Sequence, residues 1–287
     1  MRNFFIGSIL TFAAVLLFTE AALAQVTDIP PGPGWLPAVR RHSFEAQQAD
    51  RKKYIDGHKL DPHDLTGVWG ENGVSLNMKT LPPFTPYGKE LSDATQADIS
   101  PAGFAIESSK DPQQICDPMG FPRLFSFNYG FEFAQLPGKL IEFFEWGHTW
   151  RTIFTDGRKL PPDPPQDRYM GYAVGRWEGD TFIVESSGFD DRSWIGRDSR
   201  NGERGLPHSN EMRIVERYKR PTYDTLEVTI TITDPKVFTA PWTSSGKVQL
   251  YPGTEIGEYF CVPSDERDFQ NLVSRPAAGA EPIKEEK

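Results

Sequence analysis

EMRIVERYKRPTYDTLEVTITIT, residues 211–233, decides the fold class of this chain. Apolar and polar residues alternate with period 2 on both sides of a turn at residues 221–224, which is typical of strands with one buried face. From Leu226 to Ile232 every second residue is apolar, and threonine or glutamate stands between them. The segment therefore predicts an antiparallel hairpin of two half-buried strands.

Similar runs recur on both sides of this hairpin. Turn residues separate them at regular intervals: Pro137-Gly138, Asp156-Gly157, Gly179-Asp180 and Pro252-Gly253. Helical periodicity is nearly absent, apart from a short helix expected to start near Pro86. We therefore predict an all-β fold, an antiparallel meander of about nine strands in a barrel or sandwich, with a long irregular N-terminal arm.

The 287 residues divide into four predicted segments. Residues 1–24 combine Arg2, an apolar run and an A-x-A site, which is the pattern of a secretory signal peptide. Residues 25–63 are a lead-in segment with a helix over 43–55, residues 64–273 are a single β domain, and residues 274–287 are a disordered polar tail. The leader predicts a periplasmic or secreted protein without a membrane span.

Charge and cysteine content narrow the function classes. The formal net charge of −9 and the absence of a basic stripe argue against a nucleic-acid partner. Cys116 and Cys261 both follow the leader, so an oxidising compartment favours a disulfide between them. Two buried free thiols are the alternative.

Several charged residues share a face with apolar ones. Glu216 alternates in phase with Ile214 and Tyr218, and Arg151 in phase with Ile153. In KLIEFFEW, residues 139–146, one glutamate falls on each face: Glu142 lies with Leu140, Phe144 and Trp146, and Glu145 lies with Ile141 and Phe143. Because a buried carboxylate needs a partner, we expect Glu145 or Glu216 to pair with Arg151. Such a cluster is an ion pair at a barrel end or part of a ligand pocket, unless periodicity assigns these residues to the wrong faces.

Candidate catalytic residues lie around a long loop. No G-x-S-x-G, P-loop, C-x-x-C or H-E-x-x-H motif is present, and we expect no metal or cofactor. His208 precedes a strand and follows the loop that carries Asp190 and Trp194. Its ordinary pKa suits proton transfer, with Glu185 or Asp190 to orient the ring. An ordinary surface loop is the alternative.

Arg123 lies in CDPMGFPRL, residues 116–124, where glycine and prolines make a rigid turn. An arginine there can bind a ligand carboxylate with two hydrogen bonds, or pair with a local acid.

The motifs DLTGVW, CDPMGFPR, GRWEGDTFIVES and PHSNEM resemble those of a large family of exported bacterial proteins. The resemblance extends over roughly residues 64–265 and implies a shared fold, but no activity or catalytic residue. The GVW of residues 67–69 also resembles the opening of lipocalin-like barrels.

Three functions remain open from the sequence. The first is binding of a small organic molecule in an apolar pocket, oriented by Arg151, Glu145 and Glu216. Arg123, Trp146 and Trp194 are further candidates for contact with that ligand. The second is an acid–base enzyme, a hydrolase, lyase or isomerase that uses His208 with a carboxylate. The third is a structural or accessory protein without a ligand.

Overall fold

The computed structural model describes residues 52, 55–70, 74, 76–95, 110–127, 129–198, 204–277 and 279. All of them belong to one unit of the chain, Ala49–Lys287. The predicted signal peptide, most of the lead-in segment and the end of the tail lie outside the described residues.

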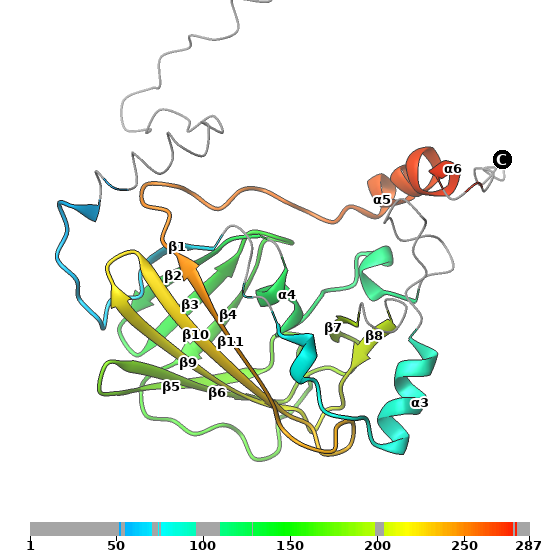
Figure 1. Cartoon of the computed structure of the whole chain (residues 1–287), viewed down its shortest axis with the longest axis horizontal. Helices are drawn as coiled ribbons and strands as arrows, with labels where there is room; N and C mark the ends of the chain where they lie inside the picture. The colour runs from blue at the N-terminus through cyan, green and yellow to red at the C-terminus, as the bar shows by residue number, and fades with distance from the viewer. Residues whose placement is uncertain are drawn as a thin grey trace, which may run out of the picture. The chain divides into compact units, whose positions relative to one another are not determined.

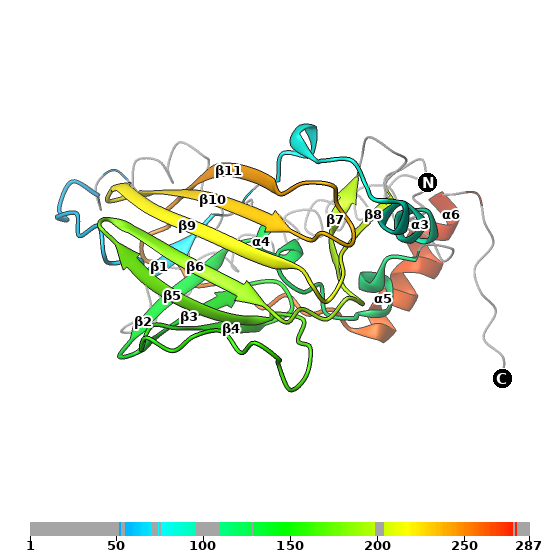
Figure 2. The ribbon, with the colours of Figure 1, turned by 90° about the horizontal axis from the view of Figure 1, so that it is seen from below.

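Nine strands form one sheet, in the order β1-β2-β3-β4-β5-β6-β9-β10-β11 (Figures 1 and 2). Their bounds are β1 Gly67–Trp69, β2 Phe131–Leu136, β3 Lys139–Phe144, β4 Thr149–Phe154, β5 Tyr172–Glu178, β6 Thr181–Ser187, β9 Arg213–Thr222, β10 Thr225–Thr233 and β11 Trp242–Gln249. The all-β prediction is confirmed.

Two details of the predicted meander were wrong. β4 and β5 pair in parallel, with Ile153 opposite Ala173, because the connection between them returns the chain to the end of the sheet where β4 begins instead of making a hairpin at Asp156-Gly157. The stretch expected to be a loop before His208 contains a second sheet, in which β7 (Trp194–Asp198) pairs with β8 (Arg204–Pro207).

The sheet closes almost completely into a barrel. Its edge strands meet where Trp69 bridges Leu250, and two hydrogen bonds flank that bridge. Gly70 N–H donates to the carbonyl of Gln249 at 3.0 Å, and Tyr251 N–H donates to that of Val68 at 2.8 Å. Pairing the edges removes backbone groups that would otherwise be open to aggregation.

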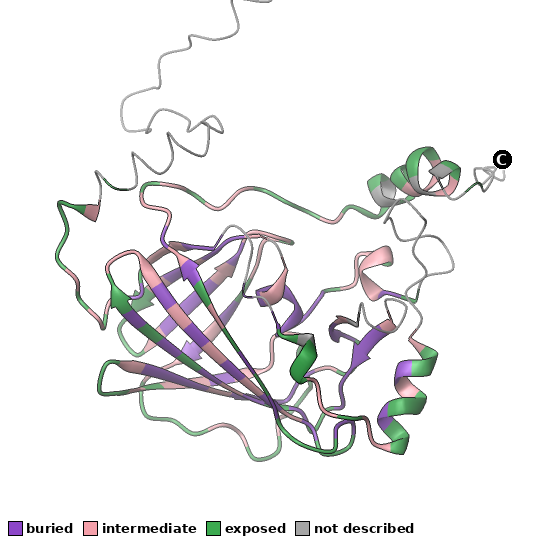
Figure 3. Ribbon diagram, viewed as in Figure 1, coloured by how far each residue is buried: buried purple, intermediate pink, exposed green. Residues whose placement is uncertain are grey.

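The barrel interior holds the hydrophobic core, and Figure 3 shows buried positions alternating along the strands. The predicted inward face of β10 is confirmed, since its four aliphatic residues are at most 1% exposed: Leu226, Val228, Ile230 and Ile232. The β5–β6 turn also follows the prediction. Gly179 has a φ of +58°, and Trp177 packs across the hairpin on Phe182.

Short helices lie outside the sheet: η1 Met78–Thr80, α3 Pro86–Ala94, η2 Pro112–Ile115, α4 Arg123–Ser126, α5 Pro263–Phe269, η4 Gln270–Ser274 and α6 Arg275–Ala277. The helix expected near Pro86 is α3, which begins after a Thr85 cap whose hydroxyl accepts from Gly88 N–H. Helical turns after β11 continue to Ala277, into the predicted tail. Within the described ranges, no helix has the length and hydrophobicity to cross a bilayer.

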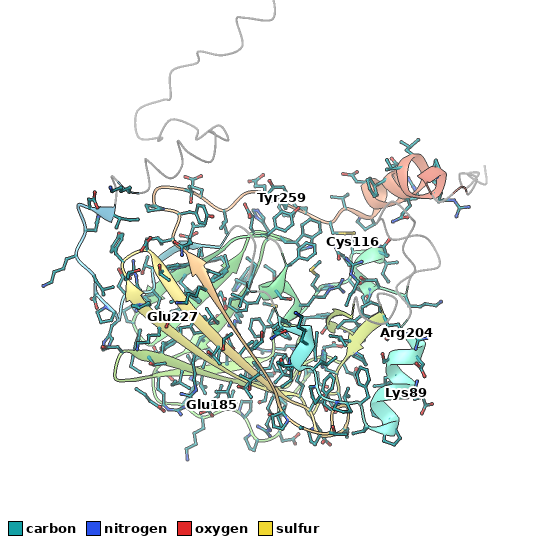
Figure 4. All side chains as sticks on the ribbon, in the orientation of Figure 1. Lys89, Cys116, Glu185, Arg204, Glu227 and Tyr259 are labelled. Carbon is teal, nitrogen blue, oxygen red and sulfur yellow. A yellow bond between two sulfur atoms is a disulfide. The ribbon has the colours of Figure 1, made fainter. Side chains whose placement is uncertain are left out.

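Cys116 and Cys261 form a disulfide, as predicted. The bond joins the end of η2 to the extended segment that leaves β11, and it closes a loop of 145 residues (Figure 4). A crosslink of this length removes much conformational freedom from the unfolded chain.

Replacing both Cys116 and Cys261 by serine should lower the free energy of unfolding by roughly 4 kcal/mol, because the unfolded chain regains the entropy of the closed loop. Urea denaturation of the oxidised wild type and of the double variant measures the difference. Reducing agent should shift the wild-type midpoint and leave that of the double variant in place. Equal midpoints for oxidised wild type and variant would contradict this expectation.

Candidate functional site

A buried ion cluster crosses the barrel interior. Arg151 of β4 directs Nη1 and Nη2 at the two carboxylate oxygens of Glu216 of β9, at 2.9 and 2.5 Å. Its Nε donates to Glu142 of the neighbouring β3, and Tyr218 donates its hydroxyl to Glu216 at 2.5 Å. The face of the guanidinium lies 3.7 Å from the ring of Phe121. The N–H groups of this guanidinium therefore donate to protein carboxylates, and its flat face packs on an aromatic ring.

Two carboxylates share one buried guanidinium, which leaves one negative charge uncompensated if both are ionised. Burial raises the pKa of Glu142 to about 7, against the opposing effect of Arg151. Its Oε1 is buried and has no hydrogen-bond partner among the described residues. When Glu142 is protonated near neutral pH, the cluster contains one cation, Arg151, and one anion, Glu216.

Of the two partners expected for Arg151, the structure places Glu216 against it and does not place Glu145 there. Glu145 lies beyond the end of β3, where its two oxygens accept from the backbone N–H groups of Gly130 at 2.9 Å and Gly257 at 2.7 Å. The adjacent Trp146 forms a bridge to Tyr259 and packs against aromatic neighbours. The alternation of faces holds only within a strand. β3 ends at Phe144, so the period-2 pattern does not predict the direction of the Glu145 side chain. Glu145 therefore holds the segment after β11 against the barrel.

Glu185 does not meet His208. Its carboxylate accepts from Arg176 Nη1 at 2.6 Å, on the outer surface of the β5–β6 hairpin (Figure 4). Both side chains are roughly half exposed, so this is a solvated surface pair.

His208 is buried, at 1% exposure, between two serines. Its Nε2 lies 2.9 Å from Ser193 Oγ, and its Nδ1 lies 3.0 Å from the carbonyl oxygen of Ser209. Burial lowers the pKa of the ring, which favours the neutral form. Asp190 accepts a hydrogen bond from Arg192 Nη2 at 2.6 Å instead. No carboxylate of the described residues hydrogen-bonds the imidazole.

Arg123 pairs with a local acid. Its Nη1 and Nη2 donate to the two oxygens of Asp111, both at 2.6 Å, and the pair is buried. The guanidinium also lies 5.6 Å from the ring of Trp194, which packs against Gly205 and is 4% exposed. These residues join η2, α4 and the β7–β8 hairpin.

A cleft of about 370 Å³ opens where β6, β9 and β10 meet a proline-rich loop. Its volume is within the range of small-molecule sites. The lining residues are Pro161, Pro162, Pro164, Ser187, Gly188, Asn210, Glu211, Met212, Arg213, Thr233 and Pro235.

Buried polar contacts support the floor of this cleft. Ser209, next to the lining residue Asn210, donates its backbone N–H and hydroxyl to Asp234 at 2.6 and 2.8 Å. The imidazole of His208 hydrogen-bonds the backbone carbonyl of Ser209, so the buried ring is connected to the segment that lines the cleft.

Sequence reasoning missed every residue of this cleft. The signal that was available is the run of prolines at 161–165 between two predicted strands, together with Arg213 on the polar face of its strand. Among the described residues, no group of three or more His, Cys, Asp or Glu side chains is arranged to hold a metal ion.

No protein-family model, curated protein or solved structure matches this chain. The resemblance to exported bacterial proteins therefore stays a prediction, and the geometry of the site carries the functional argument.

The stability of the barrel should fall as pH rises from about 4.5 to about 7. Glu142 ionises in this window in the unfolded chain but stays protonated in the barrel, so proton binding stabilises the folded state at the acidic end. The loss can reach roughly 3 kcal/mol, from the size of the pKa shift. Chemical denaturation at a series of pH values measures it.

Glu142→Gln removes the titrating group and should flatten this slope. Glu185→Gln, the same change at an exposed surface pair, should keep the wild-type slope. A Glu142→Gln slope equal to that of the wild type would assign the pH dependence to other groups.

Proposed function

We propose that this protein is an exported β-barrel that binds a small organic molecule in the cleft at the ends of β6, β9 and β10. The single observation that carries the proposal is the cleft itself, about 370 Å³ in volume, where prolines lie beside hydroxyl, amide and guanidinium groups. Binding sites for small molecules combine apolar walls with a few polar groups in this way.

The barrel interior gives weaker support for ligand binding than the cleft does. Arg151 and Glu216 already satisfy one another, and the rings around them are at most 1% exposed: Phe121, Phe125, Phe131, Phe133 and Tyr218. An ion cluster inside a packed core favours a role in holding the strands in place.

The acid–base alternative has one favourable observation, the 2.9 Å contact between His208 and Ser193. Both side chains are 1% exposed, and the ring has a backbone carbonyl rather than a carboxylate on its other nitrogen. A general base must be accessible to the substrate, and this buried ring is not. We therefore favour ligand binding over catalysis.

Export agrees with the Cys116–Cys261 disulfide, since such bonds persist in oxidising compartments. The predicted leader at residues 1–24 points to the same location.

A neutral fluorescent probe, N-phenyl-1-naphthylamine, tests the site. Its fluorescence should rise with the wild-type protein, and Thr233→Phe should reduce the rise several-fold because the ring fills the cleft. Thr229→Phe makes the same change on the same face of β10, four residues from the cleft, and should bind the probe like the wild type. The accessory-protein alternative predicts no rise in any of the three, and an equal rise in all three would locate binding elsewhere.

A further inference from the structure

The floor of the cleft carries a row of three polar side chains from neighbouring strands. Arg213 lies opposite Thr233 in the pairing of β9 with β10. On its other side Ser186 of β6 pairs with Ile214, which brings Ser187 beside Arg213. All three line the cleft from the outer face of the sheet. Across the three strands, the row consists of the Ser187 hydroxyl, the Arg213 guanidinium and the Thr233 hydroxyl.

The guanidinium of Arg213 is exposed and forms no ion pair with any residue that the structure describes. The nearest acid in the lining, Glu211, is engaged by Lys236 at 3.0 Å. The cleft therefore has one unpaired positive charge, in a protein whose formal net charge is −9. An arginine presents paired N–H donors whose geometry matches a carboxylate.

Prolines make the wall beside the row apolar. Pro161, Pro162 and Pro164 line the cleft. The loop packs closely against Gly188, where φ is +73° and an added Cβ would approach Pro164 to 3.1 Å and Tyr172 to 2.9 Å. A preformed apolar wall binds a hydrocarbon body with little ordering cost.

We propose that the cleft binds organic monocarboxylates, with Arg213 holding the carboxylate and the proline wall holding an apolar body. The proposal rests on the proposed function and names the class of ligand for that site. A monoanion is favoured over a phosphate dianion, because one arginine next to Glu211 balances a single negative charge.

Three acid–amide pairs test whether the negative charge of the ligand contributes to binding: benzoate with benzamide, hexanoate with hexanamide, and 2-naphthoate with 2-naphthamide. Titration calorimetry of the wild-type protein should show at least one acid binding about tenfold tighter than its amide, which has nearly the same shape without the charge. Phenyl phosphate is the comparison for a dianion and should bind more weakly than benzoate.

Arg213→Gln should weaken binding of the acid about tenfold and leave the amide unchanged. Arg217→Gln is the matched control. It removes the same charge from the same face of β9, about 13 Å further along the strand and outside the cleft,. It should preserve the difference between acid and amide.

The possible failures are distinct. Equal affinities of acids and amides, with binding that Thr233→Phe abolishes, would overturn the carboxylate proposal and keep the cleft as a binding site. Tighter binding of phenyl phosphate, or equal effects of Arg213→Gln and Arg217→Gln, would also overturn it. Absence of binding by all six compounds would overturn it too, and the neutral probe then decides separately whether the cleft binds small molecules.

Discussion

The paired hydrogen bonds between Arg151 and Glu216 cross the barrel interior from β4 to β9, two strands that β5 and β6 separate in the sheet. Both side chains are buried, so removing either one leaves a charge without a partner, at a cost of roughly 3–5 kcal/mol. A buried ion pair adds little net stability over a well-packed apolar core. The contact is specific to the observed register, because a one-residue shift of β9 would turn Glu216 to the other face of the sheet.

The same register places Arg213 on the outer face of the sheet, where it lines the cleft. Glu216 and Arg213 are three residues apart on β9, so the alternation of side chains puts the glutamate inside the barrel and the arginine outside. A shift of one residue would exchange these faces, burying an unpaired arginine and exposing the glutamate. The interior ion pair and the exterior row of Ser187, Arg213 and Thr233 are thus two consequences of one alignment.

Segments outside the sheet are held by specific polar contacts and by covalent bonding. The chain after β11 is fastened by Glu145 through Gly257, and further along by the disulfide at Cys261. Arg123 and Asp111 join η2 to α4, and the His208–Ser193 contact joins β7 to the segment before β9. Of the predicted site residues, His208, Arg123 and Glu145 therefore connect segments outside the sheet, whereas Glu185 and Asp190 form local ion pairs with Arg176 and Arg192.

Local patterns in the sequence predicted most strands of the nine-stranded sheet, the inward faces of β9 and β10 and the turn at Gly179, and favoured the pairing of the two cysteines, but they missed β7 and β8. Each follows from neighbouring residues or, for the disulfide, from simple counting. Only the tertiary structure decided that Arg151 meets Glu142 as well as Glu216, that Glu185 meets Arg176, and that β5 runs parallel to β4. Those contacts depend on how the sheet curves and closes, and the cleft combines four segments far apart in the chain. Periodicity along one strand contains no information about which distant segment will lie against it.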